Sequence, residues 1–102
     1  MNLKIENRHL CILKQILSKY PYQFYAYGSR VKGKSWKFSD LDLCYQEDIP
    51  RGIIYQVQEE LEESDLPFFV ELVNWKQMRP EFQEMIKEDL FLISSPSTLS
   101  VD

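Results

Sequence analysis

The sequence holds few of the residues that mark several common kinds of active site. Its 102 residues include one histidine, two cysteines and three glycines. The single histidine, His9, lies beside the apolar stripe of a predicted helix, so no histidine-based proton transfer is expected. The P-loop pattern G-x-x-x-x-G-K-[ST] is absent, which excludes that kind of phosphate site. No run of about 18 or more apolar residues occurs, so no segment is expected to span a membrane.

Neither the cysteines nor the N-terminal segment indicates secretion. Cys11 and Cys44 lie far apart in apolar runs, and we expect reduced thiols rather than a disulfide. The segment MNLKIENRHL is polar and charged and lacks the apolar core of a signal peptide. We therefore expect a cytoplasmic protein.

The charge is small overall but unevenly distributed. The formal net charge of −4 argues against general nucleic-acid affinity, and no direct binding to nucleic acid is expected. Residues 30–37 carry four cations and no acid, whereas the segment EELEESD at 59–65 is almost entirely acidic. The length suits one domain, which we place at residues 1–93. The remainder, 94–102, is polar and lacks periodicity, so we expect a flexible tail.

Hydrophobic periodicity predicts short strands between amphipathic helices. The predicted helices cover 5–20, 53–63 and a segment that begins near Pro80, and the predicted strands cover 23–27, 41–45 and 68–75. Pro21 ends the first helix, and Pro80 suits the first turn of the last one. The third strand is apolar enough to be covered on both faces. This order predicts an α+β fold in which helices pack on a small mixed sheet.

Two aspartates at the start of the second predicted strand form a D-x-D pair. Asp40 and Asp42 are two residues apart, and alternate residues of a strand share one face. Two carboxylates on one face repel each other, and both stay ionised only if a cation lies between them. The pair indicates a metal site, although Asp40 could equally belong to a turn and Asp42 to an exposed strand position.

A third acid, Glu71, lies in the most apolar segment of the chain, FFVELVNW. An unpaired carboxylate buried there would be costly. Either this strand is at a sheet edge and Glu71 faces water, or it lies beside the D-x-D strand and brings Glu71 next to Asp40 and Asp42. In the second case three carboxylates offer an oxygen-rich site for one or two Mg²⁺ ions, which suit in-line phosphoryl transfer.

A glycine–serine turn and a group of cations precede the aspartates. Gly28 directly follows a predicted strand, where glycine permits a sharp turn that exposes backbone N–H groups. Ser29 adds a hydroxyl, and Arg30 begins the cationic stretch. Such groups suit the phosphates of a Mg²⁺–triphosphate complex whose metal is held by the carboxylates.

The segment GSRVKGKSWKFSDLDL resembles the G-S-x(10)-D-x-D signature of the nucleotidyltransferase superfamily that includes DNA polymerase β. The chain is most similar to the minimal nucleotidyltransferases of bacteria and archaea, and the similarity covers nearly its whole length. The resemblance implies a polymerase β-like nucleotidyltransferase fold. It also implies nucleotide binding by Gly28, Ser29, Arg30 and Ser39, and catalysis and metal binding by Asp40, Asp42 and Glu71.

The resemblance further implies a partner protein. Larger relatives add domains for their acceptors, and we expect this chain to find its acceptor on another molecule. Minimal nucleotidyltransferases typically accompany a HEPN protein, which is a helical, RNase-like toxin. The implied activity is Mg²⁺-dependent transfer of AMP from ATP to a hydroxyl of that toxin, most simply a tyrosine hydroxyl. The chain would then act as the antitoxin of a toxin–antitoxin pair and form a hetero-oligomer with the toxin.

One position departs from the family pattern. The third acid of the family is usually Asp, and Glu71 is one methylene longer. This difference keeps an alternative open, in which a catalytically weak or inactive nucleotide-binding antitoxin neutralises its partner by occlusion. A D-x-D glycosyltransferase is disfavoured, because a nucleotide-sugar domain would be far larger than this chain.

Overall fold

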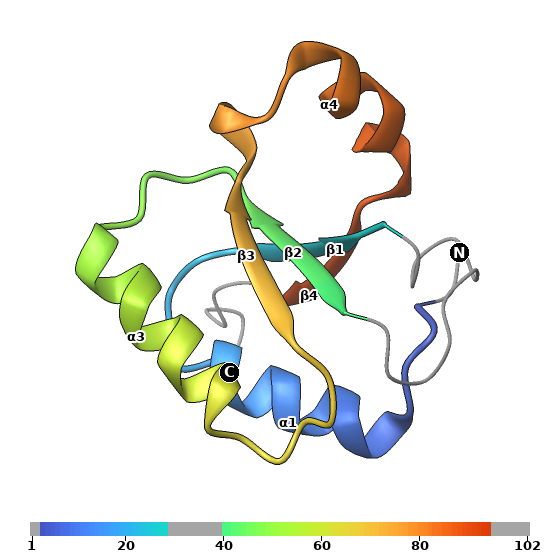
Figure 1. Cartoon of the computed structure of the whole chain (residues 1–102). Coiled ribbons are helices and arrows are strands. Elements are labelled where there is room, and N and C mark those ends of the chain that lie inside the picture. Colours follow the sequence, from blue (N-terminus) through green and yellow to red (C-terminus); the bar gives the residue numbers. More distant parts are fainter. Residues whose placement is uncertain (1–2, 29–39, 95–102) are drawn as a thin grey trace, which may run out of the picture.

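The computed structural model describes residues 3–28 and 40–94, which form a four-stranded sheet with helices packed on it (Figure 1). In chain order the elements are α1 (Asn7–Leu17), β1 (Phe24–Tyr27), β2 (Leu41–Tyr45), α3 (Arg51–Glu62), β3 (Val70–Asn74), the 3-10 helix η1 (Trp75–Gln77), α4 (Pro80–Ile86), the 3-10 helix η2 (Lys87–Asp89) and β4 (Phe91–Ser94). The α+β class predicted from the sequence is confirmed.

The sheet has the strand order β3-β2-β1-β4 and is mixed. β1 pairs with β2 and with β4 in antiparallel fashion, whereas β2 and β3 are parallel. The connection between the parallel strands contains α3, because a parallel pair cannot be joined by a tight turn. As a result, residues from β2 and β3 that are far apart in sequence lie side by side with their side chains in step.

The main core lies between the sheet and the helices α1 and α3, which lie next to each other (Figure 1). Strand alternation directs Leu41, Leu43 and Tyr45 of β2 into this core. The other buried members are Leu13, Leu17, Tyr20, Phe24, Ala26, Val57, Leu61, Phe68, Val70 and Ile93. Tyr20 also donates a hydrogen bond of 2.7 Å from its hydroxyl to Glu60 Oε1, which links the segment after α1 to α3.

The opposite face of the sheet carries a smaller apolar cluster. Its buried members are Tyr27 of β1, Cys44 of β2 and Ile86 of α4, and Trp75 packs against them. Burial raises the pKa of the Cys44 thiol to about 12. α4 lies beyond one end of β2 and β3 (Figure 1), so this cluster covers only part of the face. The rest of the face is where the acidic residues of β2 and β3 lie.

Some sequence-based boundaries need correction. α1 ends at Leu17, three residues before the predicted end. β3 is at the edge of the sheet and only its Val70 is buried, so the expectation of a strand covered on both faces is wrong. The predicted order also lacks β4, which ends at Ser94, the first residue of the expected tail. Residues 95–102 lie outside the described part of the chain.

The cysteines agree with the sequence-based expectation. Cys11 is exposed and Cys44 is buried, and neither forms a disulfide. In the described ranges 3–28 and 40–94, no helix is both long and apolar enough to cross a membrane.

Candidate functional site

The parallel pairing of β2 and β3 places two acids side by side. Asp42 is the register partner of Glu71, and on its other side it is paired with Tyr27 of β1. Neighbouring strands are about 4.8 Å apart, and residues in one row project from the same face. Glu71, Asp42 and Tyr27 therefore form a row across three strands. Both possibilities raised for Glu71 hold in part, since it is exposed on an edge strand and is also next to Asp42.

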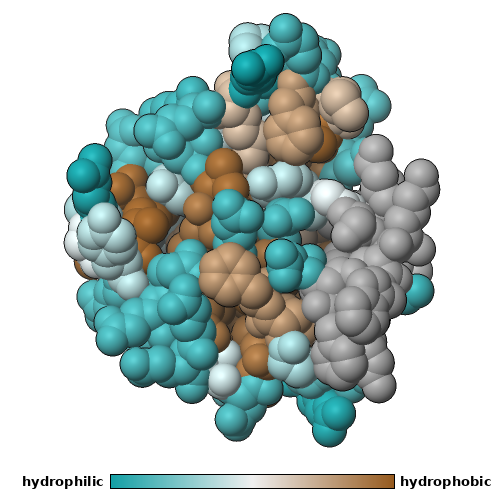
Figure 2. Space-filling view, viewed as in Figure 1, coloured by the Kyte–Doolittle hydropathy of each residue, from teal (hydrophilic) through white to brown (hydrophobic). Residues whose placement is uncertain are grey.

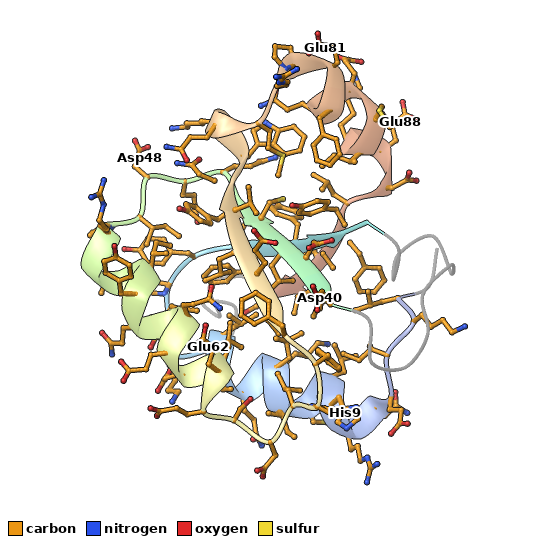
Figure 3. The ribbon with its side chains drawn as sticks, in the orientation of Figure 1. His9, Asp40, Asp48, Glu62, Glu81 and Glu88 are labelled. Atoms are coloured by element: carbon orange, nitrogen blue, oxygen red, sulfur yellow. The ribbon has the colours of Figure 1, made fainter. Side chains whose placement is uncertain are left out.

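Asp40 lies one step before β2, two residues from Asp42. The Leu41 backbone N–H donates to the Phe69 carbonyl oxygen at 2.9 Å, so the pairing of the two strands begins at this level. Figure 3 shows Asp40 at the start of β2, whereas the labelled acids Asp48 and Glu81 lie at the periphery of the molecule. The site thus draws its acids from one end of β2 and from the adjacent part of β3.

The three acids interact electrostatically. Burial raises the pKa of Asp42 above its usual range, and the negative charges of Glu71 and Asp40 raise it further. In the described part of the chain, no Lys, Arg or His side chain forms an ion pair with any of the three. A cation bound beside the half-buried Asp42 would stabilise its ionised form.

Gly28 brings the backbone against the Asp42 carboxylate. Its φ of +91° is a conformation that side-chain-bearing residues rarely adopt. A Cβ atom added to Gly28 would lie 2.8 Å from Asp42 Oδ2, which is closer than such atoms approach in proteins. Both the turn and the close approach thus require glycine at this position, directly beside the acidic row.

The donor set suits a hard divalent cation in type, because carboxylate oxygens are the ligands that Mg²⁺ prefers. Among residues 3–28 and 40–94, however, no three His, Cys, Asp or Glu side chains are gathered closely enough to hold a metal ion. Asp40, Asp42 and Glu71 share a face, and their negative charges repel one another. To bind one cation, their side chains would have to move closer together. The backbone brings the three acids into one neighbourhood, and a bound cation would draw their carboxylates together.

Aromatic residues that were not singled out from the sequence border this site. Tyr27 is buried beside Asp42, and its ring makes an edge-to-face contact with Phe82 of α4, with centroids 5.9 Å apart. Burial raises the pKa of Tyr27, and the charge of Asp42 raises it further. The segment FYAY could have predicted this position for Tyr27, because strand alternation places Tyr25 and Tyr27 on the face opposite to Phe24.

Three of the sequence-predicted nucleotide-binding residues are not described by the structure. Ser29, Arg30 and Ser39 lie outside residues 3–28 and 40–94. Of that predicted group the structure describes Gly28, and it describes all three predicted carboxylates. Their assigned roles in binding and catalysis remain predictions.

Comparison with known proteins identifies the family of this chain. The sequence model of the family described as "Polymerase beta, Nucleotidyltransferase" matches residues 12–98. The chain belongs to the polymerase β-like nucleotidyltransferase family. The match includes every element from within α1 to β4 and all seven residues that the sequence predicted for the site.

The chain is also similar to an individual protein with a described activity. The chain is 39% identical over 90 residues to a "Probable protein adenylyltransferase MntA" from Haemophilus influenzae, and the match covers 84% of this chain and 79% of the relative. The predicted resemblance to minimal nucleotidyltransferases is thereby confirmed. This nucleotidyltransferase therefore places Asp42 and Glu71 on neighbouring strands of the family's fold, with Gly28 beside them.

Proposed function

We propose that this nucleotidyltransferase moves AMP from ATP to a hydroxyl group, most simply that of a tyrosine, on a HEPN-family toxin and so acts as an antitoxin. The observation that carries the proposal is the register pairing of Asp42 with Glu71 beside the Gly28 turn, in a chain of this family. The related protein's description as a probable protein adenylyltransferase supports AMP as the transferred group and a protein as its acceptor.

The proposed reaction is an in-line displacement at the α-phosphorus of ATP. The acceptor oxygen forms a bond to this phosphorus while the bond to the bridging oxygen of the β-phosphate breaks, and pyrophosphate leaves with the electron pair. The acceptor's proton passes to the Glu71 carboxylate, which is exposed and thus within reach of an incoming hydroxyl. The strand pairing also keeps Glu71 next to Asp42, so the proton acceptor lies beside the other carboxylate of the site.

The chain's own residues divide the work of binding. Gly28 offers backbone at the point where the nucleotide phosphates approach the acids, with Ser29, Arg30 and Ser39 assigned to the phosphates from the sequence. Asp40, Asp42 and Glu71 would hold one or two Mg²⁺ ions. When bound, Mg²⁺ neutralises the developing charge on the phosphate oxygens and polarises the phosphorus.

The direct test combines the protein, ATP, Mg²⁺ and the HEPN-family toxin proposed as its partner. Intact-mass spectrometry is expected to show AMP-sized increments on the partner, with pyrophosphate released in equal amount, and peptide mapping is expected to place AMP on a tyrosine. Omission of Mg²⁺ should abolish both signals. If no increment forms, while a relative with Asp at the Glu71 position modifies the same partner, the catalytic proposal is wrong.

A second candidate function is neutralisation of the partner by occlusion without chemistry. It is favoured by one observation, namely that the described side chains do not gather into a three-ligand metal site. Asp42→Asn separates the two functions, because it removes a metal ligand while changing the surface little. Loss of toxin neutralisation with an intact complex supports catalysis, whereas unchanged neutralisation supports occlusion.

A further inference from the structure

Phe69 is an exposed aromatic side chain on the face that carries the acids. Its relative exposure is 47%, whereas its neighbours Phe68 and Val70 are buried at 8% and 2%. Glu71 is again exposed, so the segment alternates between core and surface from Phe68 onward. This alternation places Phe69 on the same side of the chain as Glu71.

The pairing of the strands fixes where Phe69 lies along this face. Leu41 is the register partner of Val70, and its N–H donates to the Phe69 carbonyl oxygen at 2.9 Å. One step earlier in the same register, Phe69 is opposite Asp40. It is two residues, about 7 Å, along the chain from Glu71. The phenyl ring therefore projects from the same face as the acids, at the position next to those of Asp40 and Glu71.

Within residues 3–28 and 40–94, the surroundings leave the Phe69 side as an open approach to Glu71. On the side of β1 and α4, the paired acids Asp42 and Glu71 are bordered by the buried Tyr27, whose ring contacts Phe82. β3 is an edge strand, and within the described residues no strand pairs with its outer side. Figure 2 shows hydrophobic surface directly beside the polar groups over the central strands. A protein-borne acceptor that reaches Glu71 would pass over this apolar surface.

We propose that the ring of Phe69 contacts the aromatic ring of the acceptor tyrosine and thereby selects tyrosine over serine or threonine. This inference rests on the proposed AMP transfer and names the group that positions its acceptor. An aromatic pair adds favourable contact beyond the burial of area, and a serine or threonine side chain offers no ring to form it. The transfer reaction is unchanged, with the tyrosine oxygen replacing pyrophosphate on the α-phosphorus.

The test is steady-state AMP transfer to the HEPN partner by Phe69→Ala, Phe69→Leu and Phe69→Tyr. Phe69→Ala is expected to raise KM for the partner about tenfold, with kcat and the KM for ATP little changed. Phe69→Tyr should restore the wild-type KM, and Phe69→Leu should not, because leucine is apolar but has no ring. Replacement of the acceptor tyrosine by serine in the partner lowers the rate of AMP transfer. This loss should be smaller when the enzyme is Phe69→Ala than when it is the wild type.

Leu92→Ala is the matched control, since Leu92 has a relative exposure of 46% and lies on β4 at the other edge of the sheet. It should leave the partner's KM unchanged. If Phe69→Ala also leaves it unchanged, or if leucine restores it as well as tyrosine does, the inference is wrong and AMP transfer stands. If the wild-type enzyme transfers no AMP to any acceptor, the proposed function fails and the inference fails with it.

Discussion

Gly28 brings the backbone of the turn after β1 directly against the Asp42 carboxylate. Its φ is positive, and a Cβ atom at this position would lie 2.8 Å from Asp42 Oδ2, so there is no room for a side chain. We predict that Gly28→Ala displaces the Asp42 carboxylate. The substitution should lower stability by about 1–3 kcal/mol, because alanine must adopt a strained conformation, and should also sharply reduce AMP transfer.

Gly52 supplies the control for that experiment. It lies in α3, and an added Cβ would meet nothing within 4 Å. Gly52→Ala should leave activity unchanged and raise stability by up to about 1 kcal/mol, since alanine favours the helix. Thermal unfolding and transfer assays on both variants provide the measurement. Equal behaviour of the two variants would contradict the role given to Gly28.

Asp42 gives a prediction for pH. Its pKa in the folded chain is raised above the ordinary value of 3.8 by burial and by Glu71 and Asp40. The protonated form therefore favours folding, a contribution that is complete below the ordinary pKa and is lost as pH rises through the raised one. At neutral pH the ionised group destabilises the fold. Asp42→Asn should unfold at a higher temperature than the wild type at pH 7, with a difference that shrinks towards acid pH.

The same variant tests the link between this charge and a cation. Mg²⁺ that binds only the folded chain adds about 1.4 kcal/mol of stability at ten times its dissociation constant. Thermal unfolding at pH 7 with and without Mg²⁺ should show an increase for the wild type and none for Asp42→Asn. An equal Mg²⁺ effect on both proteins would place the ion elsewhere.

At the level of single residues, the sequence predicted which side chains could form the site, but not which of them lie next to each other in the fold. The spacing of Asp40 and Asp42 predicted a shared face, and the apolar surroundings of Glu71 singled it out. The register that pairs Glu71 with Asp42 depends on how α3 returns the chain to the sheet, which no local pattern encodes. The approach of Gly28 to Asp42 depends in turn on the pairing of β1 with β2.

Among the elements, α3 holds the edge strand that carries Glu71. The Gln58 side-chain amide on α3 donates to the carbonyl oxygen of Val70 at 2.6 Å. We predict that Gln58→Ala lowers the free energy of unfolding by about 1 kcal/mol, because a partly buried strand carbonyl loses its partner. Urea unfolding should show a lower midpoint at an unchanged slope.

Glu59→Ala is the matched substitution for Gln58→Ala, because Glu59 is exposed on the same helix. It gains the same helix propensity without losing a contact to β3, so stability should change by no more than about 0.5 kcal/mol. If both substitutions have the same effect on the midpoint, the Gln58 hydrogen bond does not stabilise β3.

The elements that the sequence missed were decided by tertiary pairing. β4 has four residues, which is too short for a clear pattern of alternating apolar and polar side chains. It pairs with β1 after the short helices α4 and η2 bring the chain back to the sheet. The apolar run around β3 suggested burial on both faces, yet β3 is an edge strand. Within this run, Val70 of β3 is buried in the core, whereas Phe69, directly before β3, is exposed on the face that carries the acids.

On the scale of the whole molecule, the two faces of the sheet have separate tasks. One face packs on α1 and α3 and forms the main core, and the other carries the acids beside a small cluster under α4. Substitutions of the acids therefore leave the main core intact, so losses of activity can be separated from losses of folding. The family model matches residues 12–98, a range that includes all four strands of this sheet.

In the proposed reaction, Asp42 and Glu71 act together as one catalytic site. The most direct measurement is the single-turnover rate of AMP transfer to the partner by Asp42→Asn, Glu71→Gln and the double variant. Each single variant should lose at least about a hundredfold in rate, and the double variant should be little worse than the poorer single one. A wild-type rate for Glu71→Gln would show that Glu71 merely faces water, and would contradict its catalytic role.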